Sequence, residues 1–156
     1  LSICQLHCTI KVNLSARNLM VKPKVIFSSA ELLARDEASF VNCPNGYRWA
    51  RLFLLSYQHS ADTYNTYRRE VERFLQWARY VHQVDVEAMT RHDCQQYIQF
   101  FINPPANWIG LKNEVRFLDQ VIPPTPNPQW RPFVQKAGAK RQVSAAAIKS
   151  MLACLQ

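Results

Sequence analysis

The stretch SADTYNTYRREVERFLQW, residues 60–77, contains the strongest structural signal in this sequence. Its apolar residues recur at intervals of three and four positions. This spacing places an apolar side chain on the same side of an α-helix at each turn. Ser60, or Asp62 and Thr63 one step later, is suited to capping the first turn. The stretch therefore predicts an amphipathic helix that runs from Ser60 to about His82.

Similar patterns predict further helices on both sides of this one. In residues 47–58, one apolar face is predicted to contain Trp49, Leu52, Phe53 and Leu55, with Arg48 and Arg51 off that face. The spacing of Thr90 and Asp93 is that of a capping box. The predicted helices are residues 28–35, 47–58, 60–82, 90–103 and 144–155. The expected fold class is therefore all-α, a small bundle of four to five helices without a confident strand.

Prolines interrupt the helical patterns after residue 103. Seven of the nine prolines lie in residues 104–132. Proline lacks a backbone N–H and disrupts helix interiors, so we predict a long connection here, partly extended, with a short helix around residues 112–118. Trp130 and Phe133 are expected to anchor the end of this connection to the core.

The predicted domain organisation has two parts. Residues 1–43 are expected to form an N-terminal extension that is partly disordered. Within it, residues 1–19 are not expected to be native, because Met20 resembles an ordinary protein start. Residues 44–156 are expected to form one helical domain with a proline-rich insertion at 104–132. The sequence ends in the middle of a predicted helix, so we expect it to stop before a further domain.

The charge of the chain is positive and unevenly distributed. The formal net charge is +8, and no acidic residue precedes Glu31 or follows Asp119, although both ends carry lysines and arginines. These side chains displace counterions from phosphates, so the acid-free stretches favour a polyanionic partner such as nucleic acid. The alternative is a helical protein–protein interaction module whose basic charge is incidental, a role that small helical domains also serve.

The residue types that usually form enzyme sites do not cluster in this sequence. The four histidines are scattered, and with three glycines no phosphate-binding loop occurs. Cys4, His7 and Cys8 lie close together but lack a second ligand pair, so we do not predict a zinc site. Five cysteines, an odd number, favour a reducing compartment over a disulfide framework. No apolar run approaches the roughly 20 residues of a membrane span. We predict no catalytic residue, metal, cofactor, small-molecule substrate or membrane partner.

Three stretches resemble segments of one protein family. Residues 60–77 follow the pattern S-x-x-T-x-x-x-Y-x-x-x-x-x-x-F-x-x-W and look like the first core helix of the SAM-like core-binding domain of tyrosine recombinases, the phage-integrase family. Residues 89–97, MTRHDCQQY, are similar to the second helix of that domain. Residues 129–133, QWRPF, look like a stretch of one branch of large integrases. The resemblance covers about residues 45–156.

The resemblance implies one half of a DNA clamp. In this family the N-terminal helical domain and a C-terminal catalytic domain grip opposite faces of the recombination site on double-stranded DNA. The catalytic domain supplies an Arg, a Lys, an H-x-x-R motif and a nucleophilic Tyr, and none of these is identifiable here. The resemblance therefore implies DNA binding for integration or recombination, without catalysis by this stretch. It also implies self-association on DNA as an option, and a location in the bacterial cytoplasm with the nucleoid.

Two helix starts are the candidate DNA-contact surfaces, because helix N-termini offer unpaired backbone N–H groups to phosphate. The resemblance places the start of the helix at residue 60 in or beside the major groove. There Thr66 and Arg69 are expected to reach base edges, and Thr63 a phosphate. The first surface consists of Thr63, Asn65, Thr66, Arg68 and Arg69. The alternative is that Thr63 is only a helix cap and that the arginines are only solvated.

The second candidate surface lies in the acid-free C-terminal stretch. It consists of Lys140, Arg141, Ser144 and Lys149. The Ala-Gly-Ala sequence of residues 137–139 suits a phosphate contact that becomes ordered on binding. Arg131 is expected either to contact phosphate or to stack on Trp130. Aromatic residues at helical core spacings are expected to pack in the core and not to stack on bases.

Overall fold

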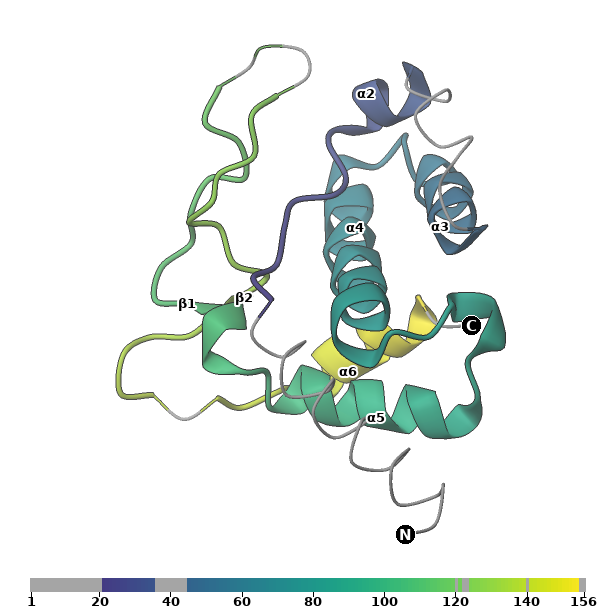
Figure 1. The fold of residues 1–156 in the computed structure, drawn as a ribbon. Coiled ribbons are helices and arrows are strands. Elements are labelled where there is room, and N and C mark those ends of the chain that lie inside the picture. The colour runs from purple at the N-terminus through teal and green to yellow at the C-terminus, as the bar shows by residue number, and fades with distance from the viewer. Residues whose placement is uncertain (1–20, 36–44, 120, 122–123, 140, 155–156) are drawn as a thin grey trace, which may run out of the picture.

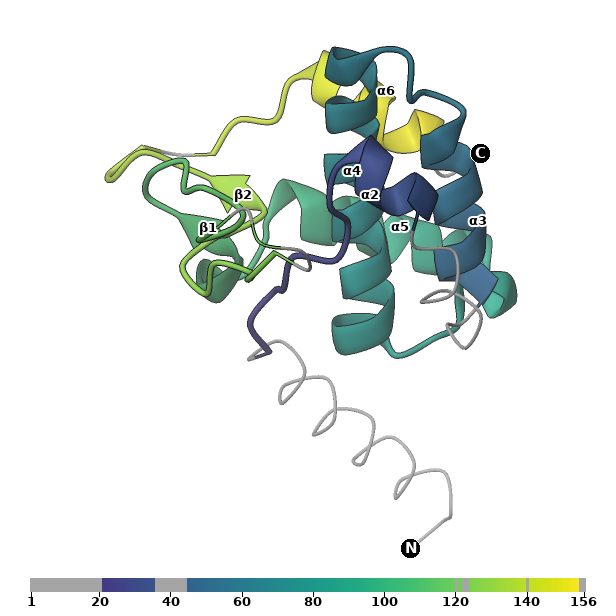
Figure 2. The same ribbon diagram turned by 90° about the horizontal axis from the view of Figure 1, so that it is seen from above.

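The computed structural model describes residues 21–35, 45–119, 121, 124–139 and 141–154 (Figures 1 and 2). The α-helices are α2 (Ala30–Arg35), α3 (Asn45–Leu55), α4 (Ala61–Gln76), α5 (Arg91–Ile102) and α6 (Ala145–Ala153). The other elements are the π-helical turn η2 (Trp77–His82), the 3-10 turns η3 (Val86–Ala88) and η4 (Ala106–Trp108), and the strands β1 (Ile109–Gly110) and β2 (Phe133–Val134). The predicted all-α class is confirmed, and the two short strands, which were not predicted, pair in parallel.

Helix α4 is central and packs against α3 and α6. The helix predicted from Ser60 to His82 is present, but its last six residues form the π-helical turn η2. Ser60 occupies the N-cap position, yet its hydroxyl donates to the Thr63 hydroxyl at 2.8 Å and does not bond to a backbone N–H. The turn ends at Gln83, whose φ of 58° lies in the left-handed region.

Aromatic residues form the core where α4, α5 and β2 meet. Phe74 of α4 meets Tyr97 of α5 edge-on, with ring centroids 5.0 Å apart. Phe101 of α5 packs against Phe133 of β2 at 5.9 Å. Trp130 and Phe133 are buried, as predicted for the end of the proline-rich segment. This core joins the last turn of α4 to α5 and to the segment that leads into β2.

Two predicted helix caps form as expected. Thr90 and Asp93 make a capping box, in which the Asp93 carboxylate accepts from the Thr90 backbone N–H at 2.6 Å. The Ser144 hydroxyl accepts from the Ala147 backbone N–H at 3.1 Å. Both caps follow from residues within three positions, so the local pattern was sufficient to predict them.

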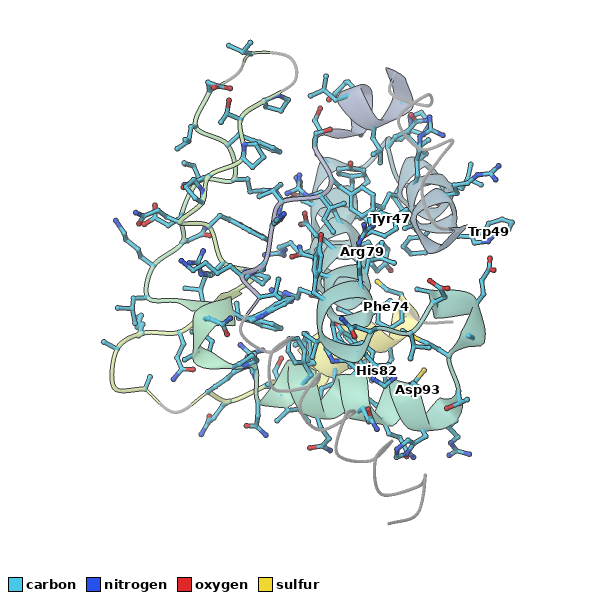
Figure 3. All side chains as sticks on the ribbon, in the orientation of Figure 1. Tyr47, Trp49, Phe74, Arg79, His82 and Asp93 are labelled. Carbon is cyan, nitrogen blue, oxygen red and sulfur yellow. The ribbon has the colours of Figure 1, made fainter. Side chains whose placement is uncertain are left out.

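The apolar face that was predicted for α3 is wrong for Trp49 and Leu52, whereas Phe53 and Leu55 pack against the core as predicted. Trp49 and Leu52 are exposed, at 65% and 54%, whereas Leu54 and Arg51 are buried. The Arg51 guanidinium donates to the Leu33 and Ala34 carbonyl oxygens of α2, at 3.0 and 3.2 Å. The last carbonyl groups of a helix lack hydrogen-bond donors within the helix. The Arg51 side chain supplies such donors to the end of α2, and for this reason it is buried. Figure 3 shows Trp49 pointing away from the other helices.

An extended N-terminal segment, residues 21–28, runs between α4 and the proline-rich segment (Figure 1). Gln76 of α4 accepts from the Lys24 backbone N–H at 2.7 Å, and Glu72 accepts from the Phe27 backbone N–H at 3.3 Å. Phe27 is fully buried. These bonds satisfy two buried polar side chains of α4, which would otherwise destabilise the core.

The proline-rich segment forms an antiparallel ribbon, which we define as residues 111–119, 121 and 124–128. Phe117 pairs with Pro126, the Leu118 backbone N–H donates to the Thr125 carbonyl at 2.9 Å, and the Asn127 N–H donates to the Arg116 carbonyl at 2.8 Å. The helix predicted around residues 112–118 is therefore wrong, because these backbone groups pair across the ribbon. In Figure 1 the ribbon stands apart from the helices, beyond the extended segment 21–28. No helix among the described residues is long and apolar enough to cross a membrane.

Candidate nucleic-acid interface

An open groove of about 940 Å³ lies between the first half of α4 and the ribbon. Six arginines line it: Arg68, Arg69, Arg73, Arg116, Arg131 and Arg141. Asp62 and Glu114 are the two acidic residues in the lining. We call this feature the arginine groove. Such an excess of fixed positive charge in a hollow suits an anionic partner.

The α4 wall presents most of the first predicted surface to the groove. Asn65 and Arg69 are exposed and Thr66 is half-buried, and all three line the groove. Arg68 is also half-buried there, and its guanidinium donates to the Ser28 carbonyl at 3.3 Å. Burial, followed by the nearby Arg116 charge, lowers the pKa of Arg68 to about 10, so Arg68 stays charged at neutral pH. Asn65, Thr66 and Arg69 are therefore the uncharged and basic side chains of this wall without such an anchor, and the exposed Asp62 lies beside them in the lining.

Two arginines are anchored and hold the walls of the groove together. The Arg73 guanidinium donates to the Pro132 carbonyl at 2.9 and 2.6 Å and to Glu70 at 2.9 Å. Arg116 of the ribbon donates to the fully buried Glu72 of α4 at 2.7 Å. These contacts fix the position of the ribbon and neutralise part of the charge of the two arginines.

Arg116 makes two further contacts that lock its guanidinium in place. It donates to the Phe27 carbonyl at 2.9 Å and lies over the Trp130 ring, 4.8 Å from the centroid. The stacking on Trp130 that was one expectation for Arg131 is thus made by Arg116. Arg131 instead donates to the Pro128 and Trp130 carbonyls at 2.8 and 2.7 Å.

Arg141, from the second predicted surface, reaches the same groove. Its guanidinium donates to the Phe101 carbonyl at 3.1 Å and lies 4.6 Å from the centroid of the Phe133 ring. Burial, and after it the Arg73 charge, lowers the pKa of Arg141. Arg73 lies 4.7 Å from the same Phe133 ring, so this ring is contacted by two guanidinium groups.

The structure therefore brings part of both predicted surfaces together in one groove. The predicted residues that line it are Asn65, Thr66, Arg68, Arg69 and Arg141. Thr63, Ser144 and Lys149 are not in its lining, and Lys140 lies outside the described residues. Sequence reasoning missed Arg73 and Arg116, since Arg73 fits an ordinary exposed helix position and Arg116 lies in a stretch predicted as helix.

A second hollow, of about 590 Å³, lies between the start of α3 and the end of η2. Its charged lining residues are Arg79, Asp85 and Glu87. Arg79 lies over the Tyr47 ring at 5.8 Å, and both residues are labelled in Figure 3. With one base and two acids, this hollow does not suit a polyanion.

No group of three or more His, Cys, Asp or Glu side chains that could hold a metal ion occurs in the described ranges. The cluster of Cys4, His7 and Cys8 lies outside those ranges. Cys94 and Cys154 are free thiols. The main feature of the described residues is therefore the charged surface of the arginine groove.

Comparison with known protein families gives one match. Residues 48–102 match the model described as phage integrase, N-terminal SAM-like domain. This segment contains most of α3, all of α4 and α5, and ends before the ribbon. It confirms the resemblance that was drawn from residues 60–77 and 89–97. No curated protein and no solved structure matches the chain.

Proposed function

Starting from a phage-integrase SAM-like domain at residues 48–102, we propose that this protein binds duplex DNA through the arginine groove. The protein would act as the core-binding part of a site-specific tyrosine recombinase that holds a recombination or attachment site. The observation that carries this proposal is the collection of six arginines in one groove beside the start of α4. Phosphate contacts of this kind supply most of the affinity of proteins for DNA.

Some side chains of the groove would contact DNA directly, and others would supply a fixed positive charge. Arg69 is exposed and has no hydrogen-bond partner among the described residues, so it is suited to contact phosphate or a base edge. Asn65 and Thr66 lie beside it and would hydrogen-bond to base edges or sugars. Arg73 and Arg116 would contribute a fixed positive field, because carbonyl and carboxylate oxygens already hold them.

The remaining predicted contacts belong to the same proposal. Thr63 at the start of α4 would hold a phosphate, and Ser144 and Lys149 of α6, with Lys140, would contact the backbone at a second place. Strand cleavage would belong to a catalytic domain, and contacts between copies would form on DNA. Both statements rest on the family, of which the match covers the N-terminal domain.

A salt titration of binding to a fluorescent duplex tests the proposal. We expect the affinity of the wild type to fall steeply as salt rises. For Arg69→Ala we expect weaker binding and a log–log salt slope that is shallower by about one unit, since one phosphate contact is lost. Arg91→Ala, which removes an exposed arginine of α5 outside the groove, is the matched control and should keep the wild-type slope.

The competing function is a protein–protein interaction module, and the exposed Trp49 and Leu52 of α3 favour it. Absence of duplex binding by the wild type at low salt would reject the DNA-binding proposal. If the wild type does not bind DNA, and Trp49→Ser abolishes its self-association or its binding to a protein partner, the alternative would be established.

A further inference from the structure

The ribbon carries apolar side chains that nothing in the described part of the chain covers. Val115, Leu118 and Val121 are exposed at 65%, 61% and 66%. Leu111 and Val134, at the base of the ribbon, are exposed at 71% and 45%. Of the eight large hydrophobic residues that are exposed in the described part of the chain, five thus lie in or beside the ribbon (Figure 1). Exposed apolar side chains gathered on one element mark interaction sites in many soluble proteins.

The ribbon beyond Arg116 has almost no charge. Residues 117–130 contain no lysine or arginine, and Asp119 is the only acidic residue among them. This part of the ribbon therefore cannot bind phosphates by charge, so its partner must offer apolar surface. Alternate prolines, Pro124, Pro126 and Pro128, remove backbone donors from one strand and make it a poor template for a strand of a second copy.

The ribbon forms one wall of the arginine groove, so it would lie beside a DNA strand bound there. Val115 and Arg116 of the ribbon line the groove on the side opposite Arg69 of α4. A phosphodiester strand in this groove would therefore have α4 on one side and the ribbon on the other. In a duplex, each strand separates the major groove from the minor groove. The family resemblance implies that the start of α4 lies at the major groove, and on this premise the ribbon would face the minor groove.

The base of the ribbon is held in place by contacts with α4 and with Trp130. This base is fixed by Arg116, which bonds to Glu72 at 2.7 Å and stacks on Trp130. The two strands of the ribbon are joined by the side-chain amide of Asn127, which donates to the Val115 carbonyl at 2.8 Å. A preorganised element loses little conformational freedom on binding, which favours affinity.

We propose that the ribbon enters the minor groove of the bound duplex and contacts it through Leu118 and Val121. This inference rests on the proposed function. The sugars that line the minor groove provide the apolar surface, and aliphatic side chains are used elsewhere as wedges between base steps. The ribbon lies outside the matched segment 48–102, so it would add a DNA contact to the SAM-like domain.

The test uses the full chain with the double variant Leu118→Ser/Val121→Ser, and Leu52→Ser on α3 as a control of similar exposure. Both change exposed side chains and should leave folding intact. We expect the double variant to bind duplex DNA about tenfold more weakly, because apolar contacts are lost. Its salt slope should equal that of the wild type, because no phosphate contact is removed. The minor-groove ligand netropsin should compete with the wild type, and Leu52→Ser should bind normally.

Several outcomes would overturn the inference and leave DNA binding itself intact. These are wild-type affinity of the double variant, a shallower salt slope in it, or wild-type binding that netropsin does not affect. Loss of self-association in the double variant without DNA, at unchanged DNA affinity, would instead assign the ribbon to a second copy of the chain. Failure of the wild type to bind duplex at low salt would reject the proposed function, and the inference with it.

Discussion

The two walls of the arginine groove are held in different ways. Helix α4 is fixed by apolar contacts within the matched helical segment, such as that of Phe74 with Tyr97. The ribbon is fixed by a few polar contacts between distant residues, above all Arg116 with Glu72, 44 positions apart in the sequence. Where many weak apolar contacts hold an element, one substitution removes only a part of the stabilising free energy. Where a single buried ion pair holds it, one substitution removes the whole interaction. The ribbon should therefore respond to single substitutions at its anchors more sharply than the helices do.

The largest effect is expected for Glu72→Ala. Glu72 is fully buried and accepts hydrogen bonds from Arg116 and from the Phe27 backbone N–H. Its removal leaves the buried Arg116 guanidinium without its counter-charge and the Phe27 N–H without its acceptor, so we expect a loss of about 3–5 kcal/mol in the free energy of unfolding. Urea denaturation measures this value. Glu114→Ala, which breaks an exposed pair with Lys112, should cost about 1 kcal/mol or less. Equal losses in the two variants would contradict the comparison.

A smaller loss of stability, confined to the ribbon, is expected for Trp130→Ala. This change removes the buried ring on which Arg116 stacks, and we expect a loss of about 2–4 kcal/mol. Amide hydrogen exchange should accelerate at the ribbon amides of Leu118 and Asn127 and remain slow in the centre of α4.

The matched variant for the helical wall is Leu75→Ala, which opens a cavity beneath α4 at a residue that is 3% exposed. Its loss of stability should be similar, but exchange should accelerate through α4 and α5. Identical exchange patterns in the two variants would show that the ribbon and the helices unfold as one unit.

The smallest effect concerns pH and the start of α5. Hydrogen bonds from the Thr90 side chain and backbone, and then from His82, hold the pKa of Asp93 below its ordinary value of 3.8. The ionised carboxylate therefore stabilises the fold above pH 3.8, and this contribution is lost as the pH falls further. We expect the free energy of unfolding to decrease more steeply below about pH 4 in the wild type than in Asp93→Asn.

The control for this measurement is Asp85→Asn, at an exposed aspartate before η3, which should keep the wild-type pH dependence. Urea denaturation between pH 3 and pH 6 gives both curves. Parallel curves for the wild type and Asp93→Asn would contradict the prediction. His82 and Asp93, 2.5 Å apart, join η2 to α5 and are labelled in Figure 3. The loss of stability at low pH should affect the contact between η2 and α5 and leave the anchoring of the ribbon unchanged.

Sequence reasoning succeeded where a pattern depends on near neighbours. The long helix that contains α4, the Thr90–Asp93 capping box and the Ser144 cap were all predicted and are present. It failed for α3, where the burial of Arg51 depends on the carbonyl groups of α2. It failed again for residues 112–118, because helix propensity there is outweighed by pairing with residues beyond the next prolines.

For the groove, the sequence indicated the start of the helix at residue 60 and the basic C-terminal stretch as separate surfaces. The structure joins Asn65, Arg69 and Arg141 in one lining and adds Arg73 and Arg116 to it. An exposed arginine and a buried arginine that is held by hydrogen bonds have the same local sequence pattern. They differ in whether a carbonyl or carboxylate oxygen from a distant residue lies within reach of the guanidinium.

By itself, the sequence determined the helical class, the position of the central helix and its likeness to a phage-integrase SAM-like domain. These properties are encoded by apolar residues and caps within four positions of one another. Only the tertiary structure decided that the proline-rich segment is a ribbon and that six arginines share one groove. The physical reason is the range of the contacts: Arg73 and Arg116 are placed by oxygen atoms of residues 59 and 44 positions away, which no local periodicity records.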